Sequence, residues 1–416
     1  MKKLQEWLRL YSSLAVFLFF SLSLTLPTGY SYGASLLLLG GLATIISLNY
    51  STFKPKDWLL LAAMLSYTTI HLLGILIHNL SIREFDKPLR IALGGIALFF
   101  TIKYPPRSTY FWTGVAFGAI GAGTLALWQV LYEGIPRAGG FTMIIQFGNI
   151  SLLLGLLSAI GLIWSISNKK NLFTNGIFIA AIVLGLSGSA LSGSRGGWIA
   201  MPLATIGTIY IFRQKIKPSY ISFFTISVLI LSSILYLTPK TNVATRFKEA
   251  QSDIANYISG DTTTSLGTRF ELWRGAFIIF KESPIIGIGE KAYTERLKEL
   301  IDSGVIKPAI VSHAHNDFLD ALAKNGIIGL IAIIFLYVAP LYLFLNSQNS
   351  IDINHLCLNA AGCTFCTCYM SFGLSQSFLL HNSGVMVYSF GLAIIWSLSR
   401  HIEESKISNH RTPSIS

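Results

Sequence analysis

Residues 10–53 read LYSSLAVFLFFSLSLTLPTGYSYGASLLLLGGLATIISLNYSTF and contain no Asp, Glu, Lys or Arg. A helix needs about 20 apolar residues to cross a bilayer, so this stretch predicts two membrane spans, divided near Pro27–Tyr30. Residues 353–399 form a second run without these charged residues and predict two more spans. The fold class that follows is an all-α, polytopic membrane protein.

The composition of the whole chain agrees with that fold class. Of the 416 residues, 52% are hydrophobic and 12% are charged, and that charged share is about half of what a soluble domain carries. A disordered chain, a soluble globular enzyme and a secreted disulfide scaffold are therefore excluded. The formal net charge of +12 is then explained by basic cytoplasmic loops rather than by nucleic-acid binding.

Dividing the chain at its charged residues predicts about twelve spans. Nine are expected within residues 1–238, the ninth at 219–238, and three within 326–400, the tenth at 326–346. Between them, residues 239–325 hold 11 basic and 11 acidic residues and predict one large loop with amphipathic helices. Residues 401–416 are expected to form a polar, disordered cytoplasmic tail.

The distribution of basic residues predicts the orientation. With the N-terminus inside, the inner segments hold 15 Lys and Arg residues, and the short outer loops hold five. Because cytoplasmic loops are enriched in Lys and Arg, both termini are expected in the cytoplasm. The large loop between spans nine and ten then lies on the outer face.

Several arginines are expected near membrane depth on that outer face. Arg90 falls within the outer turn of the fourth span, Arg137 in the glycine-rich stretch Arg137–Phe141, and Arg195 in the tight turn Ser192–Trp198. An arginine at that depth is costly unless it is paired, so each is a candidate for binding a ligand. The alternatives are snorkelling of Arg90 and Arg195 to the interface and an ordinary surface turn at Arg137.

The segment Thr264–Phe280 of the large loop predicts an amphipathic helix. Four aromatic residues between positions 270 and 280 recur at spacings of 3, 4 and 3, which places them on one helical stripe. Such a helix is expected to lie on the membrane or to dock on the bundle. Arg269 and Arg274 lie off the stripe, where they either face a ligand or form a solvated, phospholipid-facing side.

Residues 311–318 read VSHAHNDF and lead into the tenth span. His313 and His315 stand two apart beside Asn316, and histidine is the side chain best suited to moving a proton at neutral pH. A metal site ranks low because residues two apart diverge on a helix and would need further ligands. A helix-capping or surface role for the histidines remains the alternative.

Together, these residues predict group transfer from a lipid diphosphate at the outer leaflet, because arginines bind phosphate oxygens as bidentate forks. In these motifs the sequence resembles the O-antigen ligase family, within the wider group of O-antigen ligases, O-antigen polymerases and protein O-oligosaccharyltransferases. The resemblance runs from about Arg137 to the tenth span. It is carried by Arg137–Phe141, Ser192–Gly197, Gly267–Arg269 through Ser283–Pro284 and Gly287–Gly289, and His313–Asn316.

The resemblance implies a membrane glycosyltransferase of the C-type architecture in the bacterial inner membrane, with its active site facing the periplasm. Such a ligase takes polysaccharide from undecaprenyl pyrophosphate and joins it to a sugar hydroxyl of lipid A-core, in lipopolysaccharide biosynthesis. It implies no metal or other cofactor, inversion at the anomeric carbon, and no nucleic-acid partner. Arg195 and Arg269 would hold the pyrophosphate, and His315 would be the base or would position the acceptor. The other implied substrate contacts are Arg90, Arg137, Arg274, His313 and Asn316.

Four other functions were weighed against the ligase. A related polymerase uses a growing chain as acceptor, but the length and the single late loop favour the ligase. A protein O-oligosaccharyltransferase usually continues further after its last span. A transporter or flippase for lipid-linked glycans would need ionisable residues at the bundle midplane or paired repeats, whereas the expected spans are nearly charge-free. A structural scaffold would leave Arg195 and His315 unexplained.

Overall fold

The computed structural model describes residues 2–45, 52–213, 243–307, 313–346 and 352–411, with Ser233 and Leu237. Regular structure throughout these residues is helical and includes no strand, which confirms the all-α prediction. The helices are α1 (Lys2–Leu22), α2 (Tyr30–Ile45), α3 (Pro55–Ile77), α4 (Asp86–Lys103), α5 (Ser108–Leu127), α6 (Ile144–Ser167), α7 (Leu172–Ser192), α8 (Ala200–Phe212), α10 (Val243–Ile258), α11 (Ser265–Glu282), α12 (Gly289–Asp302), α13 (Asp317–Asn346), α14 (Ile353–Ser375) and α15 (Asn382–Arg411).

Six of these helices are long and apolar enough to cross a membrane, so the protein is a multi-pass membrane protein. They are α3, α5 with the π-helical turn that follows it, α6, α7, α13 and α15. Helices α1, α2, α4, α8 and α14 pack among them but are shorter or more polar. Each expected span except the ninth coincides with one of these eleven helices. The ninth, 219–238, lies outside the described residues apart from Ser233 and Leu237.

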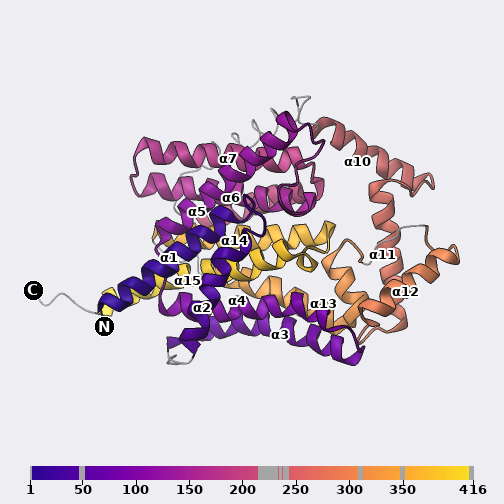
Figure 1. Ribbon diagram of the computed structural model, residues 1–416, viewed down its shortest axis with the longest axis horizontal. Helices are drawn as coiled ribbons and strands as arrows, with labels where there is room; N and C mark the ends of the chain where they lie inside the picture. The colour runs from indigo at the N-terminus through magenta and orange to yellow at the C-terminus, as the bar shows by residue number, and fades with distance from the viewer. Residues whose placement is uncertain are drawn as a thin grey trace, which may run out of the picture.

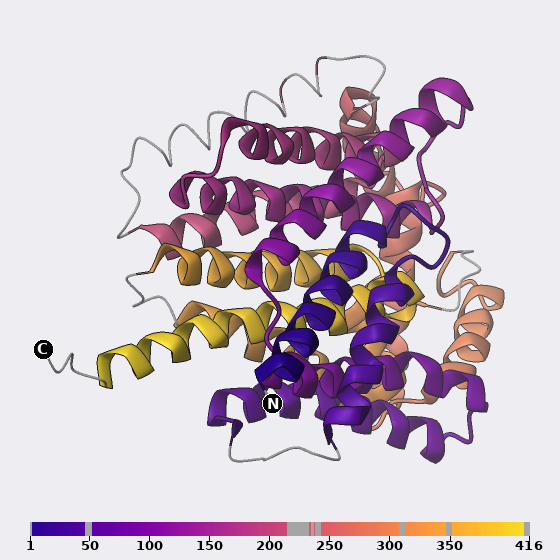
Figure 2. The ribbon, with the colours of Figure 1, turned by 60° about the vertical axis from the view of Figure 1, so that its left-hand side comes forward.

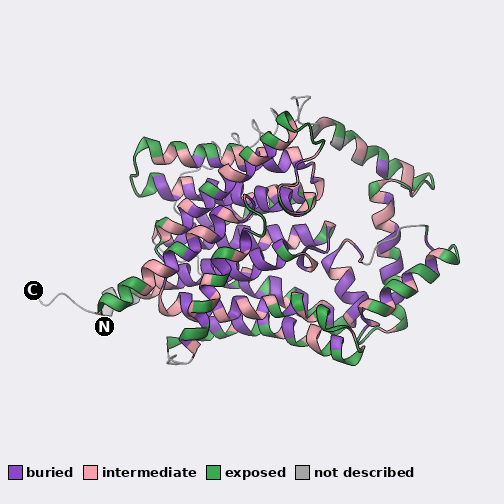
Figure 3. Ribbon diagram, in the orientation of Figure 1, coloured by how far each residue is buried: buried purple, intermediate pink, exposed green. Residues whose placement is uncertain are grey.

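The membrane helices form one bundle (Figures 1 and 2). Helices α5, α6 and α7 pack on one another, α4 packs on α15, and α3 packs on α13, while α14 contacts α6, α8 and α13. Buried residues fill the interior between them, as Figure 3 shows. Because glycines and alanines line many of these contacts, the helices approach closely, as expected of helices packed in a membrane.

Helices α10, α11 and α12 form an arm at one end of the bundle (Figure 1). The arm has a hydrophobic core of its own, in which Leu272 and Ile279 of α11 pack with Tyr293 and Leu297 of α12 and with Ala323 of α13. This core fastens the arm to the beginning of α13. The described part of the large loop is therefore an ordered helical unit.

The docked face of α11 differs from the aromatic stripe. The buried residues of α11 are glycine, alanine, leucine, isoleucine and Glu271, whereas Phe277 of the stripe is 48% exposed. Small residues let α11 approach its neighbours, while the aromatic stripe is only partly buried. An outward aromatic side suits contact with the membrane interface.

Helix α13 bends at Gly326, which has φ 65° and ψ −161°. A Cβ on Gly326 would lie 2.2 Å from the carbonyl oxygen of Ile285, and one on Gly287 would lie 2.3 Å from the carbonyl carbon of Lys324. Both glycines also have positive φ values, so two backbones meet here where no side chain fits. The bend coincides with the expected start of the tenth span.

The expectation of a disordered tail from residue 401 is wrong up to residue 411, because α15 continues to Arg411. Arg400 pairs with the buried Asp57 of α3, and Lys56 Nζ lies 2.8 Å from Glu403 Oε1. Polar composition alone suggested disorder. The structure instead pairs Glu403 of this segment, and Arg400 just before it, with the start of α3.

Candidate functional site

Arg137 holds the C-terminal end of α7. Gly193, with φ 64°, ends that helix in the left-handed conformation. Arg137 Nε donates to the carbonyl oxygen of Ser192 at 2.8 Å, and Nη2 donates to that of Gly193 at 3.4 Å. A cation at a helix C-terminus satisfies carbonyls that have no partner in the helix. The loop that carries Arg137 is itself held by Gln129, whose Oε1 accepts from two glycine amides.

Arg195 begins the short 3-10 helix η4 (Arg195–Ile199) immediately after that turn. Its Nη1 lies 3.7 Å from Glu249 Oε2 and its Nη2 lies 3.8 Å from Asp253 Oδ2, both on α10. These distances are longer than hydrogen bonds, so the two ion pairs are loose. Arg195 thus links the bundle to the arm without being tightly held by either carboxylate.

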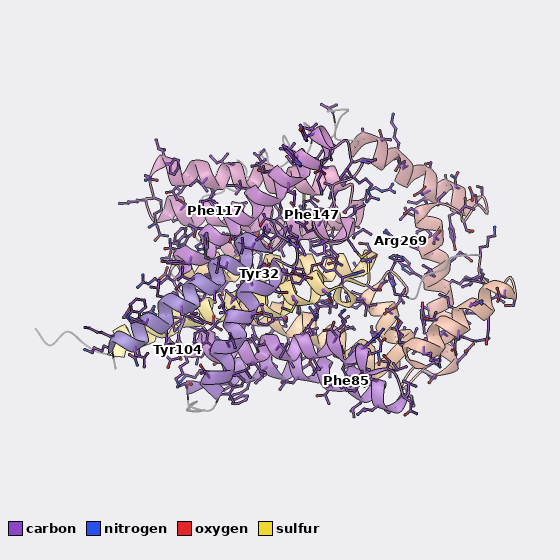
Figure 4. The ribbon with its side chains drawn as sticks, viewed as in Figure 1. Tyr32, Phe85, Tyr104, Phe117, Phe147 and Arg269 are labelled. Carbon is purple, nitrogen blue, oxygen red and sulfur yellow. The ribbon has the colours of Figure 1, made fainter. Side chains whose placement is uncertain are left out.

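Arg269 lies on the side of α11 that faces the bundle (Figure 4). Burial lowers the pKa of its guanidinium, and the positive charges of Arg195 and Arg137 lower it further. Among the described residues, no acid offsets these effects on Arg269. Arg137, Arg195 and Arg269, from three separate elements, therefore form one like-charged group, here called the arginine cluster.

The loop before α13 presents the histidines and is tied down on both sides. Asn316 Oδ1 accepts from the amides of Phe318 and Leu319 at 3.0 and 3.1 Å, which caps α13. Its Nδ2 donates to the carbonyl oxygen of Leu374 at 3.2 Å. The amide of Ala314 donates to Asp320 Oδ1 at 2.9 Å. Asn316 therefore caps α13 and holds the geometry of the loop.

His315 has φ 51°, a left-handed conformation that costs a non-glycine residue about 1 kcal/mol or more. Its Nδ1 hydrogen-bonds to Gln376 Oε1, and Gln376 Nε2 lies 2.9 Å from His381 Nε2. The His313 ring centroid lies 4.4 Å from that of His315 and 6.2 Å from that of His381. His313, His315 and His381 are called the histidine cluster below.

Burial lowers the pKa of all three histidines, that of His313 and that of His381 to about 4. For His315 the hydrogen bond to Gln376 opposes this effect, while the charge of Arg269 lowers the pKa further. The imidazoles are thus neutral near pH 7 and can accept a proton. The influence of Arg269 on His315 also shows that the two clusters adjoin, which brings the expected Arg195, Arg269 and His315 into one region.

Two of the expected arginines are engaged elsewhere. Arg274 is mostly exposed, and its Nη1 lies 3.7 Å from Glu271 Oε2 on the same helix. Arg90 pairs with Asp86 at 2.9 Å on α4. Neither contributes to the charges that act on Arg269 or His315.

Gln376 and His381 were not singled out from the sequence. They lie in the second uncharged run, at the break between its two spans, and the signal was the polar stretch Ser375–Ser383, which contains both side chains. Lys324 was missed as well. Its Nζ lies 2.6 Å from Glu290 and 2.8 Å from Asp320, beside a cavity of about 80 Å³.

No group of three or more His, Cys, Asp and Glu side chains is placed to hold a metal ion within the described ranges. In the histidine cluster, one ring nitrogen of His315 and one of His381 are already engaged by Gln376. The site as described is therefore a cationic surface next to neutral imidazoles.

Comparisons with known proteins bear on this site. A family model described as O-antigen ligase matches residues 180–334, which include Arg195, Arg269 and His315. An uncharacterized protein of Haemophilus influenzae is 32% identical over 380 residues, which are 90% of this chain and 95% of that relative. The O-antigen ligase of Escherichia coli K12 is 24% identical over 198 residues, or 46% of each chain. The ComP-specific O-oligosaccharyltransferase of Acinetobacter baylyi is 25% identical over 186 residues, 44% of this chain and 32% of that protein.

Proposed function

This chain belongs to the O-antigen ligase family, and from that premise we propose that it is an O-antigen ligase. It transfers polysaccharide from undecaprenyl pyrophosphate to a sugar hydroxyl of lipid A-core in lipopolysaccharide biosynthesis. The reaction takes place at the periplasmic face of the bacterial inner membrane. The name of the matched Escherichia coli relative supports this choice.

The observation that carries the proposal is the arginine cluster beside His315. Burial and two neighbouring positive charges disfavour the guanidinium of Arg269, so folding alone does not explain its position. A pyrophosphate would supply the missing negative charge, because guanidinium groups bind phosphate oxygens in bidentate geometry. Arg269 and Arg195 are the proposed pyrophosphate ligands.

The proposed chemistry is a single displacement at the anomeric carbon. The acceptor hydroxyl attacks that carbon and its proton passes to His315, while the bond from the carbon to the pyrophosphate oxygen breaks. The lipid pyrophosphate leaves with the electron pair, and the arginines stabilise its developing charge. Attack from the face opposite the leaving group inverts the anomeric configuration. No metal is needed for any of these steps.

The remaining implied contacts receive different weights from the geometry. His313 lies in the histidine cluster and Arg137 in the arginine cluster, so both are placed to touch the glycan or the pyrophosphate. Asn316 acts through the loop that it caps. Arg90 and Arg274 are paired on their own helices, and they remain outer candidates for binding the glycan or lipid headgroups.

The proposed architecture is a C-type bundle of twelve spans with both termini in the cytoplasm. The eleven bundle helices and the segment 219–238 would supply these spans. The arm within 239–325 would then be the periplasmic unit, between the spans of 1–238 and those of 326–400. The excess of basic residues in the inner segments supports this orientation.

The test is transfer of glycan from undecaprenyl pyrophosphate to lipid A-core by the purified protein with EDTA present. Wild-type protein is expected to form product. His315→Asn is expected to reduce the rate by about 10²- to 10⁴-fold, as loss of a general base does. Asparagine tolerates the left-handed backbone of residue 315, so this variant should remain folded. His401→Asn is the matched control. His401 lies in the C-terminal part of α15, and the beginning of that helix adjoins the site, so this variant should retain activity.

Each other outcome identifies a different function. Lengthening of the lipid-linked glycan itself, without transfer to lipid A-core, would make the protein a polymerase that uses the same site. Movement of an intact lipid-linked glycan across the membrane of a proteoliposome, without transfer, would indicate a flippase. Loss of activity in EDTA that is restored by a divalent cation would contradict the metal-independent mechanism.

A further inference from the structure

We propose that Gln376 is a positioning residue that sets the tautomer of His315, so that Nε2 is the nitrogen left to accept a proton. It acts together with His381, which holds the other end of the same amide. The role of this nitrogen in glycan transfer rests on the proposed function. The assignment of the tautomer itself rests only on the contacts within the site.

Gln376 is held in a fixed place. It directly follows α14, and its backbone N–H donates to the carbonyl oxygen of Phe372 at 3.1 Å. Its side chain is 1% exposed. The segment that follows is also anchored, since the amide of Leu379 donates to Asp317 Oδ1 at 3.3 Å. A buried amide between two anchored segments has little freedom to turn.

The two ends of the Gln376 amide have opposite hydrogen-bonding roles. Its Oε1, which faces His315 Nδ1, can only accept, so the proton of neutral His315 must lie on Nδ1. Its Nε2, which faces His381 Nε2, can only donate, so the proton of neutral His381 must lie on its own Nδ1. Both rings then carry Nδ1–H. The Nε2 of His315 keeps its lone pair and is the proposed base.

A neutral amide suits this task better than a carboxylate. A carboxylate at residue 376 would stabilise the imidazolium form and raise the pKa of His315. The amide orients the ring while the imidazole stays neutral, which is the form that accepts a proton from the acceptor hydroxyl. The left-handed backbone at His315 is a second sign that the fold constrains the direction of this ring.

The charges around His315 come from several elements. Arg269 faces it from α11, Asp320 from α13, and His313 and His381 from the adjoining loops. Lys87 of α4 acts on His381. Of these groups, only Asp320 favours protonation of His315. A new carboxylate at position 376 should therefore have a strong effect on the pKa of His315.

The first measurement is ¹⁵N NMR of the full-length protein in nanodiscs, with labelled histidine and with the His315 signal assigned by its loss in His315→Asn. Above pH 7 the wild-type signal is expected to show the proton on Nδ1. In Gln376→Leu the signal is expected to shift toward the Nε2–H form, because the accepting oxygen is gone. A wild-type Nε2–H tautomer, which a reversed amide would impose, would overturn the inference.

The second measurement is the pH dependence of glycan transfer. Gln376→Leu is expected to lower kcat by roughly 10- to 100-fold with little change in KM, as misorientation of a catalytic group does. Gln376→Glu is expected to move the acid limb of the pH profile of kcat to higher pH, by about one pH unit or more. Gln146→Leu is the matched control, because Gln146 is also buried and contacts the Phe378 carbonyl oxygen. Its acid limb should stay at the wild-type position.

The two proposals fail in different ways. Wild-type protein that transfers no glycan would refute the proposed function and leave the tautomer measurement to decide the role of Gln376. Active wild-type protein whose acid limb is unchanged in Gln376→Glu would refute the positioning role and leave the proposed function standing.

Discussion

The arginine near the C-terminal end of α15 and the arginines near its N-terminal end have opposite electrostatic surroundings. Arg400 is 6% exposed and pairs with Asp57 of α3 and with Glu404 of its own helix. About 27 Å away along the helix axis, at 1.5 Å per residue, α15 begins beside the histidine cluster. There the half-buried Arg269 faces Arg195 and Arg137 instead of an acid.

The difference separates charges that serve the fold from charges that serve a ligand. A buried ion pair offsets part of the desolvation cost of each of its members. The charge of Arg400 is therefore already balanced in the folded protein, without a ligand. The arginine cluster differs, because Arg269 is placed at a cost beside two like charges, although Arg195 also has loose ion pairs with Glu249 and Asp253. A pyrophosphate would complete it, so the arrangement is expected of a binding site.

Removal of the Arg400–Asp57 ion pair should have the largest effect on stability. Arg400→Ala leaves Asp57 buried without its main partner, so we expect the free energy of unfolding to fall by about 3–5 kcal/mol. Glycan transfer per folded molecule should not change. Arg107→Ala, which removes an exposed pair with Glu6, is the control and should cost at most about 1 kcal/mol. Unfolding in detergent would measure both, and equal losses would contradict the comparison.

Removal of an arginine from the arginine cluster should affect the reaction and not the fold. Arg269→Ala is expected to reduce the transfer rate by about 10²- to 10³-fold, as loss of a group that stabilises a leaving charge does. Its stability should be unchanged or raised, because one of three like charges is removed. Lys281→Ala, near the end of the same helix, should stay within about twofold of the wild-type rate, since that lysine is exposed and lies over the Phe277 ring of α11. An equal loss in both variants would mean that α11 acts as a whole.

The pH dependence should show the smallest effect. Burial and the charge of Arg269 lower the pKa of His315 from its ordinary 6.5, so the acid limb of transfer is expected below pH 6.5. Arg269→Ala removes a positive charge, which raises the pKa of His315 and should move the acid limb to higher pH. The residual activity of the variant would measure the shift. A downward shift would show that the two groups do not interact as described.

The folded fraction must be measured alongside that profile. His313 and His381 have pKa values of about 4 in the folded protein, against an ordinary 6.5. The folded state therefore binds fewer protons, and their contribution to stability is complete above pH 6.5 and declines as the pH falls toward 4. A limb that follows unfolding rather than protonation of His315 would be recognised by this control.

Much of the fold could be predicted because the length of an apolar run is a local property of the chain. Eleven of the expected spans coincide with helices for that reason. The tail was mispredicted because α15 continues through it and Glu403 finds a partner on α3 that no local pattern reveals. The aromatic stripe of α11 was correctly placed on one side of a helix, but only packing decided that the opposite, small-residue side docks.

The candidate site shows the same division between local pattern and tertiary contact. Arg195, Arg269, His313 and His315 stand in short motifs, so they were selected from the sequence together with Arg90 and Arg274. Arg269 and Arg274 are five residues apart, which at 3.6 residues per turn directs them to different sides of α11. Which side faces the bundle depends on the docking of the whole arm.

By itself, the sequence determined the membrane class, the approximate limits of the spans and the set of arginines and histidines from which a site could be made. Hydrophobic run length and residue chemistry suffice for these, because each is a property of neighbouring residues. Only the tertiary structure decided that Gln376 and His381 join His315, and that Arg400 has a buried acidic partner whereas no acid among the described residues offsets the effects on Arg269. Hydrogen bonds and ion pairs depend on distances through space between segments remote in the chain, and those distances exist only after the helices have packed.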